Sequence, residues 1–450
     1  MNAIGVFILV VLILVVLCAP RRGAFLGMMA GVLYLTQNQQ VVVLGFNLFA
    51  MRFLELAGFV RVMARREFSF SRLNKIDRGL LFLYCYYAIV YSFRGSEGMF
   101  NAIANATDAF LCYFTFRGLI ADLEDFNWFL RSFAVLLAPY TVMVVIETWT
   151  GHNLFSFLGA GGFGDWERGE RHRAFGTFRN PDLLGTLGVS FLPLYIGLAF
   201  EKASRKLGCI CIVLCLAIVW ASNSGSPIAA TAVGLIGWGF WIVRKDMRRI
   251  RWALTGLIVL LALVMKAPIW YLPSHISDIT GGSGWHRSYL MDVSFQHIGE
   301  WWLSGMAVTG TSHWFAYGAL VTTSGADITN QFLSFGINAG LGAIALFILL
   351  LTRAFSGLGK ALATVRSNFP DPTLTETMLW GFGVTLAAHI ANWLGITYFD
   401  QSYVIWFMQL ATISSLSDKY AEPLLIEKTE IDGTIEEADG LESEMQFNKS

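Results

Sequence analysis

The chain has 450 residues, of which 55% are hydrophobic and 14% are charged, and its formal net charge is zero. Soluble domains carry about 25% charged residues, so this composition, with a mean hydropathy of +0.56, excludes an ordinary soluble globular protein. Runs such as residues 5–18, 207–220 and 253–265 hold no charged side chain over lengths that approach a bilayer span. The composition predicts a polytopic membrane protein.

The apolar runs predict an all-α bundle of about 12–13 membrane-spanning helices. The first run is either a retained helix or a signal peptide. We expect a helix, because residues 1–5 carry no basic side chain and Cys-Ala-Pro is a poor cleavage site. The expected spans are residues 4–19, 24–36, 41–60, 79–93, 99–116, 128–147, 182–199, 207–221, 226–243, 252–271, 331–352, 376–395 and 402–416.

Charge in the connecting loops predicts the topology. Twenty Lys and Arg residues occupy alternate loops and six occupy the opposite ones, and the more basic loops of membrane proteins face the cytoplasm. This asymmetry predicts an external N-terminus and a cytoplasmic C-terminus. The basic loops carry Arg21, Arg22, Arg61, Arg65, Arg66, Arg72, Lys75, Arg78, Arg117, Lys202, Arg205, Lys206, Arg244, Lys245, Arg248, Arg249, Arg251, Arg353, Lys360 and Arg366. The opposite loops carry Arg94, Arg168, Arg171, Arg173, Arg179 and Arg287.

The last segment, residues 418–450, differs from the expected membrane domain at residues 1–417. It holds ten acidic residues against three lysines and few aromatic residues, a composition typical of a solvated, disordered tail. The six cysteines lie inside apolar runs and match no disulfide or zinc spacing, so we expect them to pack between helices.

The first long external loop, residues 148–181, leads from a basic cluster into an apolar helix. Pro181 favours a helix start, and Asn180 is expected to cap the free N–H groups of that helix. A helix N-terminus beside several arginines predicts an anion-binding site. The alternative is a basic loop that touches lipid headgroups or pairs with neighbouring carboxylates. The arginines of this loop are Arg168, Arg171, Arg173 and Arg179. Among them, Arg168 is best explained as a surface charge.

The second long external loop, residues 272–330, exceeds the length of a simple connector. Its apolar residues recur at helical spacing from Trp285 to Trp302, which predicts an amphipathic helix at the membrane surface. Arg287 lies near the start of that helix, facing either solvent or a site. The loop then enters the next span through Asp327 and Asn330.

Four segments of the chain carry the pattern of a membrane-protein family. Residues 173–181 have the sequence R-A-F-G-T-F-R-N-P, residues 220–226 form a small-residue turn between two spans, and Arg287 is followed by L-S-G at residues 303–305. Residues 330–333 have the sequence N-Q-F-L and precede G-L-G at residues 340–342. Over roughly residues 130–400, these segments resemble the O-antigen ligase and O-antigen polymerase superfamily of bacterial envelope proteins.

The resemblance implies a glycosyltransferase at the external face of the bacterial cytoplasmic membrane. Its donor would be a polyprenyl-diphosphate-linked glycan and its acceptor a sugar hydroxyl on a second glycan or on lipid A–core, with no cofactor and no metal. Fixed guanidinium groups suit a diphosphate leaving group, because they stabilise the charge that develops on it. The resemblance assigns the catalytic arginines to Arg173 and Arg287. Further substrate-binding candidates are Arg171, Arg179, Asn180, Asn330 and His313.

Two positions depart from the family pattern. Gly225 stands where many members have arginine, and Thr329 stands where the family has a histidine proposed to activate the acceptor. Asp327 is our expected base, with His286 and His313 as other candidates. Alternatively, Asp327 is a carboxylate that complements a helix N-terminus. The missing histidine leaves ligase, polymerase and a divergent transferase open.

Charged side chains inside the spans allow a rival function. Arg52 and Glu55 lie three residues apart and could pair with each other. Such charges are explained by structural pairing or by a transport pathway, so a polysaccharide or lipid-linked glycan transporter that binds the diphosphate without chemistry is the main alternative. A non-catalytic accessory protein is a third possibility. The chain contains no P-loop, soluble nucleotide-binding unit or nucleic-acid-binding signature. The other charged residues expected within or near spans are Asp108, Arg131, Glu147 and His389.

Overall fold

The computed structural model describes residues 1–43, 46–93, 96–161, 167–168, 171–272, 274–275, 284–314, 321–322, 325–368 and 373–421. Within these residues the chain is mostly helical, with short two-stranded antiparallel ladders as its sheet structure. The long helices are α1 (Ala3–Cys18), α2 (Arg21–Tyr34), α3 (Ala50–Ala64), α4 (Lys75–Ser92), α5 (Ser96–Leu119), α6 (Leu123–Thr150), α7 (Pro181–Ala199), α8 (Arg205–Ser222), α9 (Gly225–Gly239), α10 (Met247–Val264), α14 (Gln331–Asn368), α15 (Leu374–Trp393) and α16 (Gln401–Ala421).

The shorter elements lie in the connections between these helices. The strand pairs are β1 (Gln40–Val43) with β2 (Phe46–Phe49), β3 (Glu167–Arg168) with β4 (Arg171–His172), and β5 (Val321–Thr322) with β6 (Gly325–Ala326). The short helices are η1 (Phe70–Arg72), η2 (Leu154–Leu158), η3 (Phe240–Asp246), η4 (Ile269–Tyr271), α12 (Gly284–Gln296), α13 (Ile298–Trp301) and η5 (Val308–Trp314).

The chain has the character of a membrane protein. Among the described residues, five helical segments are long and apolar enough to cross a membrane: Leu123–Thr150, Pro181–Ala199, Arg205–Ser222, Gly225–Asp246 and Gln331–Asn368. Large apolar side chains are exposed on the outside of the bundle, among them Phe82, Val135, Val213 and Ile236. An apolar exterior of this kind suits hydrocarbon rather than water.

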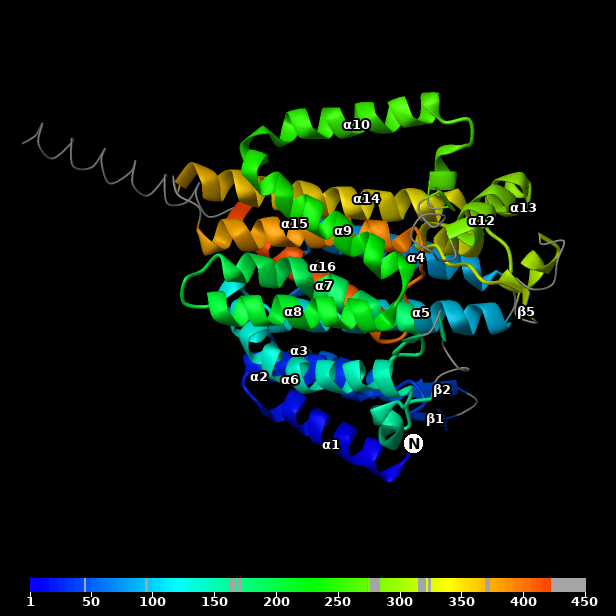
Figure 1. Cartoon of the computed structure of the whole chain (residues 1–450). Helices are drawn as coiled ribbons and strands as arrows, with labels where there is room; N and C mark the ends of the chain where they lie inside the picture. Colours follow the sequence, from blue (N-terminus) through cyan, green and yellow to red (C-terminus); the bar gives the residue numbers. More distant parts are fainter. Residues whose placement is uncertain are drawn as a thin grey trace, which may run out of the picture.

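The bundle is organised around α7, which packs against α8, α9, α15 and α16. Gly188 lets α7 and α8 approach closely, because a Cβ atom there would lie 2.6 Å from the backbone oxygen of Cys215. Small residues commonly allow such approaches between membrane helices. The core also contains stacked rings from α2 and α6, with Phe25 and Phe129 at a centroid distance of 4.0 Å. By contrast, α10 stands apart from the other helices (Figure 1), and its Leu263 side chain is 79% exposed.

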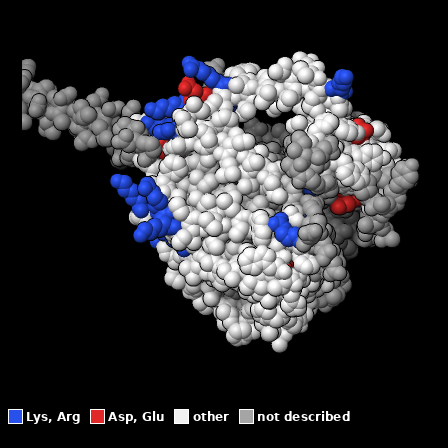
Figure 2. Space-filling model, in the orientation of Figure 1, with Lys and Arg blue, Asp and Glu red and all other residues white. Residues whose placement is uncertain are grey.

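The two sets of loops separated by the charge count lie at opposite ends of the bundle. The connections α1–α2, α3–α4, α5–α6, α7–α8 and α9–α10 lie at one end, here called the basic end, and most Lys and Arg side chains visible in Figure 2 gather there. The connections α6–α7, α8–α9 and α15–α16, together with α12 and α13, lie at the other end, here called the site end (Figure 1).

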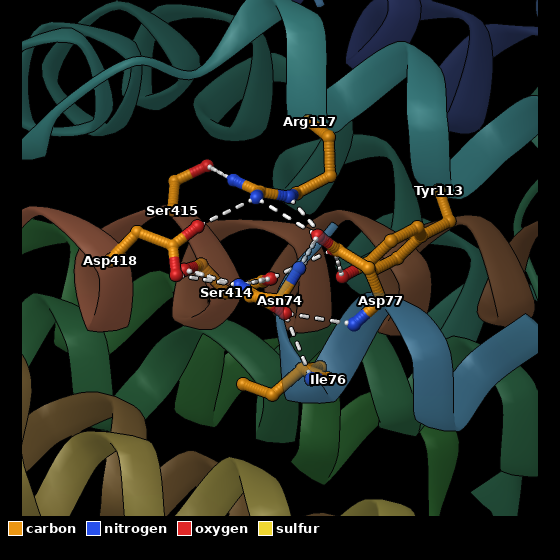
Figure 3. A network of polar contacts seen from close by, with 8 residues as sticks. All are labelled: Asn74, Ile76, Asp77, Tyr113, Arg117, Ser414, Ser415 and Asp418. Atoms are coloured by element: carbon orange, nitrogen blue, oxygen red, sulfur yellow. Dashed lines mark hydrogen bonds and ion pairs between the residues drawn. The ribbon is translucent and has the colours of Figure 1, made fainter. Parts of the chain in front are cut away.

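A polar network at the basic end joins α4, α5 and α16 (Figure 3). Arg117 lies 3.0 Å from the Asp77 carboxylate and 2.8 Å from the Asp418 carboxylate. Asn74 caps α4 together with Asp77 in a capping box, and its amide also donates to Asp418 at 2.8 Å. The Ser414 hydroxyl donates to Asp77 at 3.0 Å. Because three helices contribute to it, this network fixes their relative positions at that end.

Most of the expected spans correspond to helices, and two of them differ from expectation in the following ways. The run expected as a span at residues 41–60 begins with the β1–β2 hairpin, and α3 starts at Ala50; consecutive β-branched valines at positions 41–43 favour a strand. The last expected span at residues 402–416 continues to Ala421. Asp418, which we had assigned to the tail, therefore lies in α16, where its pairing with Arg117 holds it. Residues 422–450 of the expected tail lie outside the described residues.

Side-chain pairing also differs from expectation at one place. Arg52 and Glu55 do not pair with each other: Arg52 makes an ion pair with Asp108 of α5 at 2.7 Å, and Glu55 accepts a hydrogen bond from the Tyr403 hydroxyl at 2.7 Å. Both partners come from other helices, so tertiary packing replaces the local pair. The six cysteines are all free, and Cys112, Cys211 and Cys215 are buried between helices.

Candidate functional site

Segments far apart in the sequence meet at the site end. The N–H of Ala174, before α7, donates to the Ala221 carbonyl near the end of α8 at 3.0 Å. Similarly, the N–H of Leu341 in α14 donates to the Trp302 carbonyl after α13 at 2.7 Å. The four segments that resemble family motifs are therefore joined in two pairs by direct backbone hydrogen bonds. The connection between α15 and α16, residues 394–400, lies between the two pairs.

The segment from Arg173 to Asn180 is held by α6. The Glu147 carboxylate accepts hydrogen bonds from the N–H groups of Phe175 and Gly176 at 3.0 and 3.1 Å. Gly176 has φ +58°, and a Cβ atom there would lie 2.5 Å from the Tyr140 hydroxyl. Only glycine tolerates both constraints at low cost. Glu147, noted in the sequence only as a charge near a span, is thus the residue that shapes this segment.

Arg173 is buried between the first turn of α7 and the α8–α9 turn. Its guanidinium donates to the Ser224 hydroxyl at 2.6 Å and to the Ser222 carbonyl at 3.3 Å. The Asp182 carboxylate in the first turn of α7 lies 3.6 Å away. The side chain of Arg173 is 8% exposed. Its two hydrogen bonds to Ser222 and Ser224 mean that the small-residue turn at residues 220–226 orients it.

Arg287 of α12 contacts the α15–α16 connection, which also contacts this turn. Its Nε donates to the Gly395 carbonyl at 2.9 Å, and the Ser226 hydroxyl donates to the same carbonyl at 3.0 Å. Ser226 is two residues from Ser224, the partner of Arg173. Arg173 therefore contacts the turn directly, and Arg287 contacts Gly395, to which Ser226 of the same turn is hydrogen-bonded. The two arginines, which are more than 100 residues apart in the sequence, are linked through the Gly395 carbonyl and Ser226.

Asp327 lies in the electrostatic field of this cluster. The surrounding protein removes part of the hydration of its carboxylate, and this desolvation, together with the nearby Asp182 carboxylate, raises the pKa of Asp327. His286 and Arg287 act in the opposite direction. Burial likewise lowers the pKa of His286, against the effect of Asp327. Asp327, His286 and Arg287 are therefore neighbours at the site end.

The capping of α14 bears on the alternative role of Asp327. Asn330 caps this helix, because its Oδ1 accepts hydrogen bonds from the N–H groups of Phe332 and Leu333 at 3.0 and 3.1 Å. Asn330 also donates weakly to the Leu394 carbonyl at 3.5 Å, which ties α14 to the α15–α16 connection. Asn330 therefore supplies the cap, and Asp327 lies three residues before it in the chain. The Asp327 side chain is reachable from solvent, while the protein around it shields part of its carboxylate.

The other expected site residues lie elsewhere. Arg171 stacks on Trp220 at 4.4 Å and donates to its carbonyl. Arg179 pairs with Asp400 at 2.8 Å. Asn180 accepts a hydrogen bond from the Leu183 N–H, so it caps α7 as expected. His313 lies beside Glu300 in η5. The side chain of Arg168 and the whole of Arg94 lie outside the described residues.

A cavity of about 440 Å³ borders the α15–α16 connection. Its wall includes Thr397, Asp400 and Arg179. The carbonyl of Gly395, two residues before Thr397, accepts the hydrogen bond from Arg287. The remaining wall combines amides with aromatic rings. It includes Gln37, Asn105, Gln331, Asn338, Tyr84, Tyr87, Tyr398, Tyr403 and the Arg52–Asp108 pair. Polar amides interleaved with tyrosines provide hydrogen bonds and flat apolar surfaces, as a sugar ligand requires.

The charges in this cavity are paired. Arg179 meets Asp400, and Arg52 meets Asp108. Burial raises the pKa of Asp400 to about 6, against the lowering effect of Arg179. These arginines have no local signal for their partners. Asp108 lies in α5 and Asp400 in the α15–α16 connection, both far in the sequence from the arginines that they meet, so no local spacing reveals the pairs.

A scan of the sequence against known protein-family models finds no matching family, and a search of curated proteins finds no matching relative.

Proposed function

We propose that this chain is a membrane glycosyltransferase of the O-antigen ligase or polymerase type. It would transfer a glycan from a polyprenyl-diphosphate carrier to a sugar hydroxyl, at the external face of the bacterial cytoplasmic membrane. The observation that carries the proposal is that Arg173 contacts the 220–226 turn and Arg287 contacts the Gly395 carbonyl, to which Ser226 of that turn also donates, with Asp327 nearby. Two guanidinium groups on one site suit a diphosphate, because each can donate to its oxygens while the charge of both opposes its negative charge.

The proposed reaction is a displacement at the anomeric carbon of the donor sugar. The acceptor hydroxyl oxygen forms the new glycosidic bond as the bond to the diphosphate oxygen breaks, and the polyprenyl diphosphate leaves with the bonding electrons. The hydroxyl proton passes to the Asp327 carboxylate. Arg173 and Arg287 stabilise the charge that builds on the leaving group. The raised pKa of Asp327 suits a general base better than that of an ordinary aspartate.

The large cavity is the proposed binding site for the sugars. Its wall shares the α15–α16 connection with the arginine cluster, so a glycan bound there would lie next to the diphosphate. The orientation in the membrane is also part of the proposal: the basic end would face the cytoplasm under the positive-inside rule. The arginine cluster at the opposite end would then face outward.

A transporter of lipid-linked glycan is the second candidate. The Arg52–Asp108 pair at the cavity favours it, since charged side chains within a helix bundle often line a pathway. In that case the arginines would bind the diphosphate and no glycosidic bond would form.

The test uses purified protein in nanodiscs with an undecaprenyl-diphosphate-linked oligosaccharide. We expect longer or transferred glycan together with release of undecaprenyl diphosphate. The control variant is Arg249→Ala. Arg249 lies at the basic end and its side chain is 86% exposed, so this variant should behave as the wild type. Movement of the lipid-linked glycan across liposome membranes without a new glycosidic bond would instead establish the transporter.

A further inference from the structure

Three side chains with metal-binding atoms converge at the site end, outside the arginine cluster. His297 and Glu300 lie at the start of α13, and His313 lies in η5. Their three ligand atoms all lie within 4.8 Å of one another. His297 Nδ1 is 2.7 Å and His313 Nε2 is 3.2 Å from the same oxygen, Oε1 of Glu300.

The surroundings of His313 decide how this cluster is held together. Its Nδ1 lies 2.8 Å from the Gly310 carbonyl, which can only accept a hydrogen bond, so Nδ1 carries a hydrogen. A neutral imidazole then presents a lone pair at Nε2, and that lone pair faces the carboxylate oxygen of Glu300. Two acceptors in contact repel each other. The contact becomes favourable only if His313 is doubly protonated or if a cation lies between the two atoms.

The neighbouring side chains orient the cluster as outer-shell groups orient metal ligands. The indole N–H of Trp314 donates to the other Glu300 oxygen, Oε2, at 3.1 Å, which leaves Oε1 toward the histidines. The His297 ring stacks on Trp314, with centroids 5.4 Å apart, and is nearly perpendicular to the His313 ring. Metal-binding histidines characteristically donate their second N–H to a backbone carbonyl or carboxylate, as His313 does to Gly310.

We propose that His297, Glu300 and His313 bind a divalent transition metal, with Zn²⁺ as the best match. Zinc binds imidazole nitrogen and carboxylate oxygen at about 2.0–2.2 Å, which places tetrahedral ligand atoms about 3.3 Å apart, so small side-chain shifts complete the site. Two histidines and one glutamate supply three ligands. The fourth position is open to water, since the three side chains are 29%, 37% and 55% exposed.

The role of this metal is to hold together the segment that follows α12, the helix of Arg287. The metal joins α13 to η5, across a chain separation of 13 residues from Glu300 to His313. His297 follows Arg287 by ten residues, or about 15 Å along a helix, so the metal lies apart from the arginine cluster. This assignment replaces the expected absence of a metal and the expected substrate-binding role of His313, and it does not depend on the proposed transferase activity.

Metal binding is tested on the full-length protein in detergent after treatment with a chelator. Isothermal titration with Zn²⁺ should show one site per chain, and Co²⁺ in its place should give the visible absorption of a tetrahedral complex. His297→Ala, His313→Ala and Glu300→Gln should each weaken Zn²⁺ binding more than tenfold. Trp314→Phe, which removes only the N–H group, should weaken it about 10- to 100-fold.

The matched control is His152→Ala, an exposed histidine of the same end, which should bind Zn²⁺ as the wild type does. Thermal unfolding with and without Zn²⁺ gives an independent readout, with a shift in the wild type and none in Glu300→Gln. Absence of stoichiometric binding by folded wild-type protein would overturn the site. Binding that survives the double variant His297→Ala/His313→Ala would place the metal elsewhere and overturn it equally.

Discussion

The two ends of the bundle use arginine and aspartate in different ways. At the basic end Arg117 lies 3.0 Å from Asp77 and 2.8 Å from Asp418, and serine and asparagine side chains complete the network (Figure 3). At the site end Arg173 lies 3.6 Å from Asp182 and donates to a hydroxyl and a carbonyl, while Arg287 donates to a carbonyl. Close pairing of opposite charges fixes three helices in the first region. In the second, two arginines from distant segments meet neighbouring loops, so positive charge is brought together as a site for an anion requires.

The largest loss of stability is expected at the basic end. Arg117→Ala leaves Asp77 buried without its cation, and breaking a buried pair in this way costs about 3–5 kcal/mol. We expect a lower thermal midpoint in detergent and a reduced level in the membrane, with any loss of activity following the loss of protein. Lys419→Ala is the control, because the Lys419–Asp122 pair is largely exposed and contributes about 0–1 kcal/mol. A stable Arg117→Ala protein that lacks activity would contradict the structural role.

The next effect concerns the opposite end. Arg287→Ala should lower kcat/KM for glycan transfer about 10²- to 10³-fold, the loss typical of removing one donor to a developing negative charge. Its thermal midpoint should stay within a few degrees of the wild type. Arg249→Ala of the basic end serves as the control, because its side chain is 86% exposed. Equal losses in both variants would show that charge in general, rather than this site, matters.

A smaller effect is expected from the candidate base. Asp327→Asn should lower the transfer rate about 10²-fold, since it removes the proton acceptor. The wild-type rate should rise with pH as Asp327 loses its proton, and because its pKa is raised, this rise should occur at a higher pH than for an ordinary aspartate. The variant should lose that part of the pH profile. If the profile is unchanged in Asp327→Asn, then another group, with His286 the nearest candidate, takes the proton.

The smallest effect is expected at the turn that orients Arg173. Ser224→Ala removes the hydroxyl acceptor at 2.6 Å and should reduce kcat/KM by about tenfold. Ser222→Ala is a matched control, because Arg173 contacts the backbone carbonyl of Ser222, which the substitution retains. Similar kinetics for both variants would indicate that the turn does not position the guanidinium.

Local chemistry predicted much of the fold. The cap by Asn180 and the helix start at Pro181 follow from side chains that act within one turn, and the structure confirms both. Apolar runs likewise located the helices, since hydropathy reflects the residues of one segment. Hydropathy does not distinguish a strand from a helix, so the three valines before Ala50 were wrongly included in a span.

The site was less predictable because it depends on contacts across the chain. The arginines could be named from charge and topology, but neither Ser224 as the partner of Arg173 nor Gly395 as the partner of Arg287 has a local signal. The same holds for Asp400 and Asp108, which neutralise the cavity arginines. His297 and His313 are 16 residues apart in a loop without regular spacing, so their convergence appears only once α13 and η5 are placed.

The break in α14 couples the two halves of the candidate site mechanically. Gly340 has φ +76°, and a Cβ atom there would lie 2.3 Å from the Leu303 carbonyl oxygen, so the loop after α13 fits into the interrupted helix. Two backbone hydrogen bonds hold it there: Leu341 N–H to the Trp302 carbonyl, and Met306 N–H to the Ile337 carbonyl. A displacement of the Arg287 loop that keeps these bonds must carry the first two turns of α14 with it. Those turns bear cavity wall residues, so in the proposed transferase a movement of this loop toward the diphosphate would also change the shape of the cavity.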